Sequence, residues 1–256
     1  NLADILKDEE INITMNCRYS VIKGISAGVE YIHSLNIMHR DLKSLNILVM
    51  KRGVYDSGNF KLTDFGQAYD IDNTNTRSKG GGDKGTTFWK APEQLEDDFL
   101  FDKSTDVYSL GVLFYEVLSR KYPYEGLGEK KFYKAIDNGK FPDDIYPVEE
   151  GVCKEITDLM HNCWKLQALE RPNADKICNL INNICEMFQE LSPQIPFESI
   201  IPSSRSPRTS KIVKSEKAEQ ITNMTNTISI RTDEDIHDAV NEWCANPDNA
   251  KSKYGD

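Results

Sequence analysis

The chain of 256 residues is long enough for one domain, or for one domain with an extension, and its hydrophobic and charged contents of 39% and 28% are ordinary for a globular protein. Its formal net charge of -10 at pH 7 argues against nucleic acid as the main partner, because binding to phosphates needs a basic face. Without an apolar run of 18 residues or a CxxC pair among its six cysteines, the sequence predicts no membrane-spanning segment and a reducing, cytoplasmic location.

The first part of the chain is predicted to hold two helices and a hairpin. Apolar residues at helical spacing indicate a short helix over 1–8 and an amphipathic helix over 19–33. Two short apolar runs, 47–50 and 60–63, are typical of strands. The glycine-containing stretch 51–59 between them predicts a long hairpin connection.

The middle of the chain is predicted to be a loop followed by helices. Residues 66–92 are polar, rich in glycine and without periodicity, which predicts a mobile loop. The helix expected over 104–118, with Ser104 or Thr105 as its N-cap, is apolar nearly all round and is therefore expected to be buried. Three further helices are predicted, over 129–138, 151–165 and 173–190.

The composition changes near residue 190, which divides the chain into a main domain over 1–190 and an extension. Residues 191–230, rich in Ser, Pro, Lys and Arg with few apolar anchors, are predicted to form a disordered linker. Residues 231–256, with one candidate helix, are interpreted as the start of an incomplete second module. Because the sequence opens at Asn1 within a predicted helix, we expect it to be a piece of a longer protein.

Residues 39–46 (HRDLKSLN) bring together the groups that phosphoryl transfer requires: a base or orienting group for the incoming hydroxyl, oxygen ligands for Mg²⁺, and positive charge near the γ-phosphate. Asp41 can orient the hydroxyl, and Lys43 can neutralise charge on the γ-phosphate. Asn46 offers an oxygen to a hard cation, and Asp64, across the predicted hairpin, offers a second one. Two protein ligands are enough for Mg²⁺, because water and phosphate complete its octahedral site.

These segments resemble known motifs of eukaryotic protein kinases. Residues 39–46 look like the catalytic loop and residues 64–66 (DFG) like the metal-binding motif of that family. Residues 85–93 (GTTFWKAPE) resemble the end of a kinase activation segment, and 106–111 (DVYSLG) the start of its buried central helix. The arginine of residues 171–172 (RP) resembles the one near the end of the large lobe. Five motifs in the right order identify the chain as a member of this family.

The resemblance implies an α+β protein-kinase-like fold: a mainly helical large lobe with a short β-hairpin, the small lobe being absent. It implies ATP and Mg²⁺ as cofactors, with Asp41 and Lys43 as catalytic residues. The implied nucleotide-binding residues are Asn46, Leu48 and Asp64, of which Asn46 and Asp64 would hold the metal. No glycine-rich phosphate loop or VAIK-type lysine occurs in the sequence, so the chain alone is expected to bind ATP poorly and to be inactive.

The family also implies structural roles. Glu93 is expected to pair with Arg171, and Asp106 to bond the backbone of the catalytic loop. His39 is expected to pack under Phe65. Other histidines and aromatic residues are interpreted as ordinary helix, surface or core residues: His33, His161, His237, Tyr108 and Trp164.

The substrate is expected to be a protein, phosphorylated on Ser or Thr. Lys43 fits the Ser/Thr pattern, whereas residues such as Ser44 and the pair Cys163–Trp164 resemble the tyrosine-kinase-like group, which mostly phosphorylates Ser and Thr. An upstream kinase could phosphorylate the loop, with Arg40 as the residue that binds the phosphate. Candidate acceptors are Thr74, Thr76 and Ser78.

Two alternatives stay open at the level of the sequence. The chain could be a pseudokinase or scaffold that keeps the fold without turnover, although a scaffold has no need of Asp41, Lys43, Asn46 and Asp64 together. The main function could instead lie in residues 191–256, whose end (236–243 and 253–256) resembles the opening of a BspA-like leucine-rich repeat module.

Overall fold

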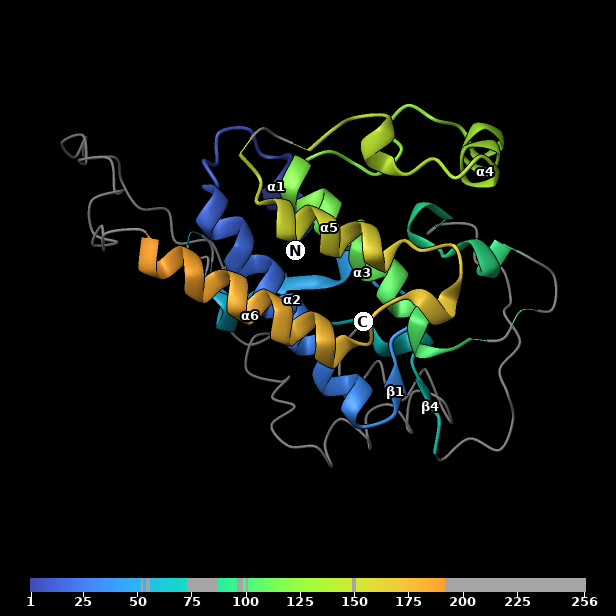
Figure 1. The fold of residues 1–256 in the computed structure, drawn as a ribbon, viewed down its shortest axis with the longest axis horizontal. Coiled ribbons are helices and arrows are strands. Elements are labelled where there is room, and N and C mark those ends of the chain that lie inside the picture. The colour runs from blue at the N-terminus through green and yellow to red at the C-terminus, as the bar shows by residue number, and fades with distance from the viewer. Residues whose placement is uncertain are drawn as a thin grey trace, which may run out of the picture. The chain divides into compact units, whose positions relative to one another are not determined.

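A computed structural model describes residues 1–51, 53, 56–72, 87–95, 99, 101–148 and 151–191 (Figure 1). The chain divides into two units, Asn1–Cys185 and Glu186–Asp256. Leu191, the first residue of the predicted linker, is the last residue of a helix, so that boundary was one residue early. The rest of the predicted linker, the second module and the three candidate phosphorylation sites lie outside the described residues.

The helix α3 (Lys103–Ser119) forms the buried centre of the first unit, as its all-round apolar pattern predicts (Figure 1). Every residue from Thr105 to Ser119 is buried. The N-cap is Asp102, whose carboxylate accepts a hydrogen bond from the Ser104 backbone N–H at 2.6 Å. The prediction of Ser104 or Thr105 as the cap was therefore wrong: the Thr105 hydroxyl donates to the Asp102 carbonyl, at 2.7 Å, and lies within the helix.

Two helices precede the site, as predicted. The helix α1 (Leu2–Lys7) is capped by Asn1, whose side chain accepts from the Asp4 backbone N–H. The helix α2 (Met15–Ser34) begins four residues before the predicted start, because Thr14 caps it by accepting from the Cys17 backbone N–H at 3.3 Å. Its buried positions recur every three or four residues, and α2 packs against α3 and against the strand Phe60–Leu62.

Two pairs of short antiparallel strands are present in the described part of the chain. The predicted hairpin is confirmed as β2 (Ile47–Val49) and β3 (Phe60–Leu62), with Leu48 opposite Lys61. The second pair, β1 (Ile37–Met38) and β4 (Tyr69–Asp70), was missed, because two-residue strands carry no periodicity.

The predicted loop over 66–92 is regular at both of its ends, so that prediction was wrong there. It begins in a 3-10 turn, Phe65–Gln67, followed by β4, and it ends in the 3-10 turns Thr87–Trp89 and Pro92–Leu95. Residues 73–86 lie outside the description.

The last three predicted helices are confirmed as α4 (Glu129–Asp137), α5 (Lys154–Cys163) and α6 (Ala174–Leu191). The helix α5 packs against α3 so closely that a Cβ at Gly111 would lie 2.7 Å from the Cys163 Cβ. The unit is thus mainly helical with short strand pairs, as expected. In the part of the chain that is described, no helix is long and apolar enough to cross a membrane.

Candidate active site

The loop between β1 and β2 closes on the Asp41 carboxylate. Lys43 Nζ lies 2.5 Å from Asp41 Oδ2, and the Asn46 side-chain amide donates to Asp41 Oδ2 at 2.9 Å and to the Asp41 carbonyl at 2.8 Å. The side chains of Asp41 and Lys43 are 14% and 15% exposed, so both still reach the surface. The structure therefore brings together the three sequence-predicted residues of this loop.

Asp64 lies next to this loop because of the hairpin. The Thr63 backbone N–H donates to the Asn46 carbonyl at 3.0 Å, which places the residue after Thr63 beside Asn46. Asp64 is exposed and has a left-handed backbone, with φ 61° and ψ 67°. Such a conformation is uncommon outside glycine and is more often adopted by Asp or Asn than by other residues. In the same hairpin, Leu48 is exposed while Ile47 is buried.

The oxygen atoms of Asn46 and Asp64 fit a Mg²⁺ site. The side-chain nitrogen of Asn46 makes both hydrogen bonds to Asp41. The side-chain oxygen of Asn46 takes no part in these two bonds. The Asp64 carboxylate is exposed. Among the described residues no cluster of three His, Cys, Asp or Glu side chains could hold a metal. A site built from one amide and one carboxylate suits a cation that keeps water and phosphate as ligands.

Asp106 of α3 holds the start of the catalytic loop, as the family resemblance implied. Its Oδ2 accepts from the His39 backbone N–H at 2.8 Å, and its Oδ1 accepts from the Arg40 backbone N–H at 2.8 Å. Burial by itself would raise the pKa of Asp106, but the hydrogen bond from His33 and the other donors outweigh it and lower the pKa. The buried carboxylate is therefore ionised at neutral pH.

His33 has a role that the sequence analysis did not assign. It was interpreted as an ordinary helix residue, but its Nε2 donates to Asp106 Oδ2 at 2.9 Å from the last turn of α2. Both side chains are buried, at 7% and 1% exposure. A polar residue on the buried face of α2 was the available signal, but its partner lies 73 residues away in the sequence.

His39 is a packing residue, as expected. Its ring lies 5.0 Å from the Phe65 ring, centroid to centroid, and its Nε2 donates to the Thr63 carbonyl at 3.0 Å. Burial lowers the pKa of His39, so the imidazole is neutral at physiological pH.

Arg40 also has a left-handed backbone, with φ 68°, and its guanidinium contacts aromatic rings. The guanidinium carbon lies 3.9 Å from the Phe101 ring centroid and 5.6 Å from that of Tyr69. These contacts place the side chain between the catalytic loop, β4 and the segment before α3.

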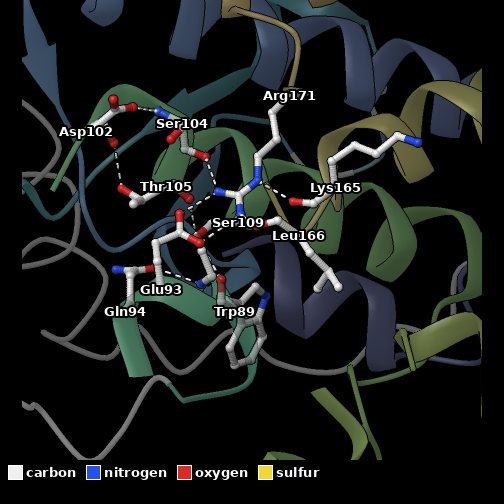
Figure 2. A network of polar contacts seen from close by, with 11 residues as sticks. Trp89, Glu93, Gln94, Asp102, Ser104, Thr105, Ser109, Lys165, Leu166 and Arg171 are labelled. Carbon is white, nitrogen blue, oxygen red and sulfur yellow. Dashed lines mark hydrogen bonds and ion pairs between the residues drawn. The ribbon is translucent and has the colours of Figure 1, made fainter. Parts of the chain in front are cut away.

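Glu93 and Arg171 form the predicted pair, shown in Figure 2. The Arg171 nitrogens Nη1 and Nη2 donate to the two Glu93 carboxylate oxygens at 2.6 and 2.7 Å. The same guanidinium donates to the carbonyls of Lys165, Ser104 and Leu166. Through these hydrogen bonds, the Arg171 guanidinium connects the end of the activation segment to the start of α3 and to the loop before α6.

A further buried cluster joins α3 to the catalytic loop and to Trp89. Glu116 accepts from the Ser44 hydroxyl at 2.8 Å and from the Trp89 indole N–H at 2.7 Å, and the Trp89 carbonyl accepts from the Ser109 hydroxyl at 2.8 Å. The sequence analysis missed this cluster. The signal for it was an acidic residue in the last part of a helix that is otherwise apolar.

The sequence profile of the protein tyrosine and serine/threonine kinase family matches residues 1–181. Because the match covers more than half of the chain, and the catalytic loop and its supports have the geometry described above, the chain belongs to the protein kinase family.

Three relatives illustrate the similarity. The probable serine/threonine-protein kinase drkD of Dictyostelium discoideum is 32% identical over 192 residues, which cover 74% of this chain and 14% of that protein. The putative serine/threonine-protein kinase/receptor R831 of Acanthamoeba polyphaga mimivirus is 34% identical over 191 residues, 73% of this chain and 11% of that protein. Human mitogen-activated protein kinase kinase kinase 7 is 33% identical over 168 residues, 64% of this chain and 25% of that protein. The chain thus spans a quarter or less of the length of these relatives.

Proposed function

We propose that this chain is the catalytic large lobe of a kinase that transfers the γ-phosphate of ATP to Ser and Thr hydroxyls of proteins. The observation that carries the proposal is that Lys43 and Asn46 both contact the Asp41 carboxylate. Asp64 lies beside them across the β2–β3 hairpin. Membership of the kinase family supports the same conclusion.

Each residue of the cluster has a proposed role. Asp41, whose carboxylate is held by Lys43 and Asn46, orients the substrate hydroxyl and accepts its proton. The Lys43 ammonium, which shares that carboxylate, stabilises negative charge on the transferred phosphoryl group. Asn46 and Asp64 hold Mg²⁺ by their side-chain oxygens, and the exposed Leu48 contacts the nucleotide base. Bound Mg²⁺ and ATP supply the phosphoryl group and most of the positive charge that neutralises it.

The preference for Ser and Thr rests on Lys43, two residues after Asp41, and on relatives whose names describe serine/threonine-protein kinases. The sequence features shared with the tyrosine-kinase-like group favour the same acceptors. A scaffold without turnover is disfavoured, because the contacts among Asp41, Lys43 and Asn46 serve no packing purpose at a partly exposed site.

Two further points belong to the proposal. The chain on its own is expected to show no measurable transfer, because its sequence contains no glycine-rich loop or VAIK-type lysine to hold the α- and β-phosphates. Regulation by an upstream kinase would act through Thr74, Thr76 or Ser78, with Arg40 as the residue that binds the phosphate.

Two substitutions separate catalysis from nucleotide binding in the longest natural protein that contains this chain. Asp41→Asn should lower the turnover rate about 100- to 10,000-fold while nucleotide affinity is kept, because it removes the general base alone. Asp64→Ala should instead abolish the Mg²⁺-dependent part of nucleotide binding. Rates of phosphoryl transfer and titration of a fluorescent ATP analogue, with and without Mg²⁺, measure the two effects.

The matched control is Asp137→Asn, at an exposed position of α4, which should leave both quantities unchanged. Turnover of the Asp41→Asn variant at the rate of the wild type would contradict the proposed role of Asp41. Unchanged Mg²⁺ dependence in the Asp64→Ala variant would contradict the metal site.

A further inference from the structure

Glu116 is an acidic residue in the apolar interior of α3, and 4% of its surface is exposed. A carboxylate in such a place is destabilised unless donors surround it. The two hydrogen bonds that Glu116 accepts come from different segments and use different oxygens: the Ser44 hydroxyl donates to Oε1, and the Trp89 indole donates to Oε2. The Ser44 backbone N–H adds a third donor.

Each donor belongs to a segment whose position matters for phosphoryl transfer. Ser44 directly follows Lys43 and begins the 3-10 turn Ser44–Asn46, so its position sets where Lys43 and Asn46 lie relative to Asp41. Trp89 ends the turn Thr87–Trp89, two residues before the Ala91-Pro92-Glu93 stretch. Its carbonyl is held by Ser109 of α3 as well (Figure 2).

We propose that Glu116 is a positioning residue. From α3 it accepts hydrogen bonds from both the catalytic loop and the segment around Trp89, and so fixes the two segments relative to each other. This inference rests on the proposed kinase function. A carboxylate suits the task because each of its oxygens is an acceptor and every partner donates to it. The Trp89 indole N–H can only donate, so a Gln side chain must keep its oxygen on Trp89 and turn its N–H toward Ser44, whose backbone N–H then loses its acceptor.

The charge state of Glu116 gives the contact a measurable signature. Burial raises the pKa of Glu116 to about 7, although the hydrogen bonds from Ser44 and Trp89 act in the opposite direction. Lys7 of α1 favours the ionised form, and the hydroxyl of Tyr122, after α3, is the other titratable group coupled to the carboxylate. Ionised Glu116 accepts from both partners. Once Glu116 is protonated, its O–H is directed to the Ser44 hydroxyl, which can accept it, and Trp89 then donates to a neutral group instead of a charged one.

Indole resonances of the ¹⁵N-tryptophan-labelled 256-residue chain test the contact directly. The Trp89 resonance, assigned by its loss in Trp89→Phe, should shift with pH with a midpoint near 7, and the shift should be absent in Glu116→Gln. Ser44→Ala, which acts on the opposite oxygen, should raise the midpoint by about one pH unit, because the ionised carboxylate loses a donor.

The matched control is Ser26→Ala, at a buried serine of α2 whose hydroxyl donates to the Ile22 carbonyl of the same helix at 2.8 Å. It should leave the Trp89 midpoint at its wild-type value. The proposed link through Glu116, from Ser44 of the catalytic loop to Trp89, would be overturned by either of two results. One is a Trp89 resonance that does not shift with pH, and the other is a midpoint that stays the same in Ser44→Ala.

Kinetics of the longest natural protein that contains this chain then test the positioning role. Glu116→Gln should lower kcat about 10- to 100-fold, with little change in KM for ATP. It should also remove the fall in kcat that is expected for the wild type below about pH 7. The double variant with Ser44→Ala should be no slower than Glu116→Gln alone, because both changes break one link.

Wild-type kcat and pH profile in Glu116→Gln would overturn the positioning role. A wild-type protein that transfers no phosphate would overturn the proposed function itself. The Trp89 titration tells these failures apart, because it reports the link whether or not phosphate is transferred.

Discussion

At the scale of single residues, the geometry of Arg171 shows why an arginine stands at this position. Its guanidinium donates to both oxygens of Glu93 and to three backbone carbonyls. The Arg171 side chain is fully buried in this pair, and that of Glu93 is 26% exposed. A planar fork of five donors can serve all these acceptors at once, whereas an ammonium group cannot.

Arg171→Lys should therefore lower the free energy of unfolding by about 2 kcal/mol, because charge-assisted hydrogen bonds are lost while the charge is kept. Urea unfolding followed by circular dichroism measures the change. A double-mutant cycle with Glu93→Gln is the control, and it should give a coupling energy of about 1 kcal/mol or more. An Arg171→Lys variant as stable as the wild type would show that the fork does not hold these segments together.

The residues of the candidate site differ in how readily the sequence reveals them. Asp41, Lys43, Asn46 and Asp64 were predicted because they lie in short loops beside apolar strands, where their spacing has a chemical meaning. The role of Glu116 could not be predicted in this way. Its partner Ser44 is 72 residues away, and the pattern of a buried helix does not say which segment faces a given polar residue.

At the scale of elements, the long helices were predictable and the shortest strands were not. The helices α2, α3 and α6 carry enough apolar residues for their period to be recognised. The pair β1–β4 depends on contacts between residues that are far apart in sequence, such as Ile37 opposite Asp70. The end of a helix depends on single caps, which explains why α2 and α3 begin at other residues than predicted.

The contact between α3 and α5 predicts an unusual effect of a glycine substitution. Gly→Ala within a helix is normally stabilising by about 1 kcal/mol. A Cβ at Gly111, however, would lie 2.7 Å from the Cys163 Cβ and 2.8 Å from the Trp164 Nε1. Gly111→Ala should therefore lower the free energy of unfolding, by about 1–3 kcal/mol, because a packed core resists an added methyl group.

Gly28→Ala in α2 is the matched control. Its Cβ would lie 3.2 Å from Leu62 Cγ and 3.3 Å from Leu62 Cδ1, and that side chain is only partly buried and can move. Thermal unfolding of both variants should show a lower Tm for Gly111→Ala and a smaller change for Gly28→Ala. The same Tm change in both would mean that α3 and α5 are not packed as closely as described.

At the scale of the whole first unit, α3 gathers the parts of the candidate site. Asp106 bonds the start of the catalytic loop, Ser109 and Glu116 bond Trp89, and Glu116 also bonds Ser44. Because α3 is buried from Thr105 to Ser119, its polar side chains there are fixed points for surface loops that have little core of their own. The kinase fold and the support from Asp106 were predictable from the order of the motifs, but the supports from Ser109 and Glu116 were visible only in three dimensions.

The most direct test of the account is a transfer assay with ATP labelled at the γ-phosphate, followed by acid hydrolysis of the protein products and separation of their phosphoamino acids. The assay uses the longest natural protein that contains this chain, with a pool of Ser-, Thr- and Tyr-containing peptides as acceptors. The account predicts labelled phosphoserine and phosphothreonine for the wild type and for Asp137→Asn, and loss of nearly all label for Asp41→Asn. Label that appears on tyrosine alone would contradict the proposed acceptors, and transfer that survives Asp41→Asn would contradict the proposed catalytic site.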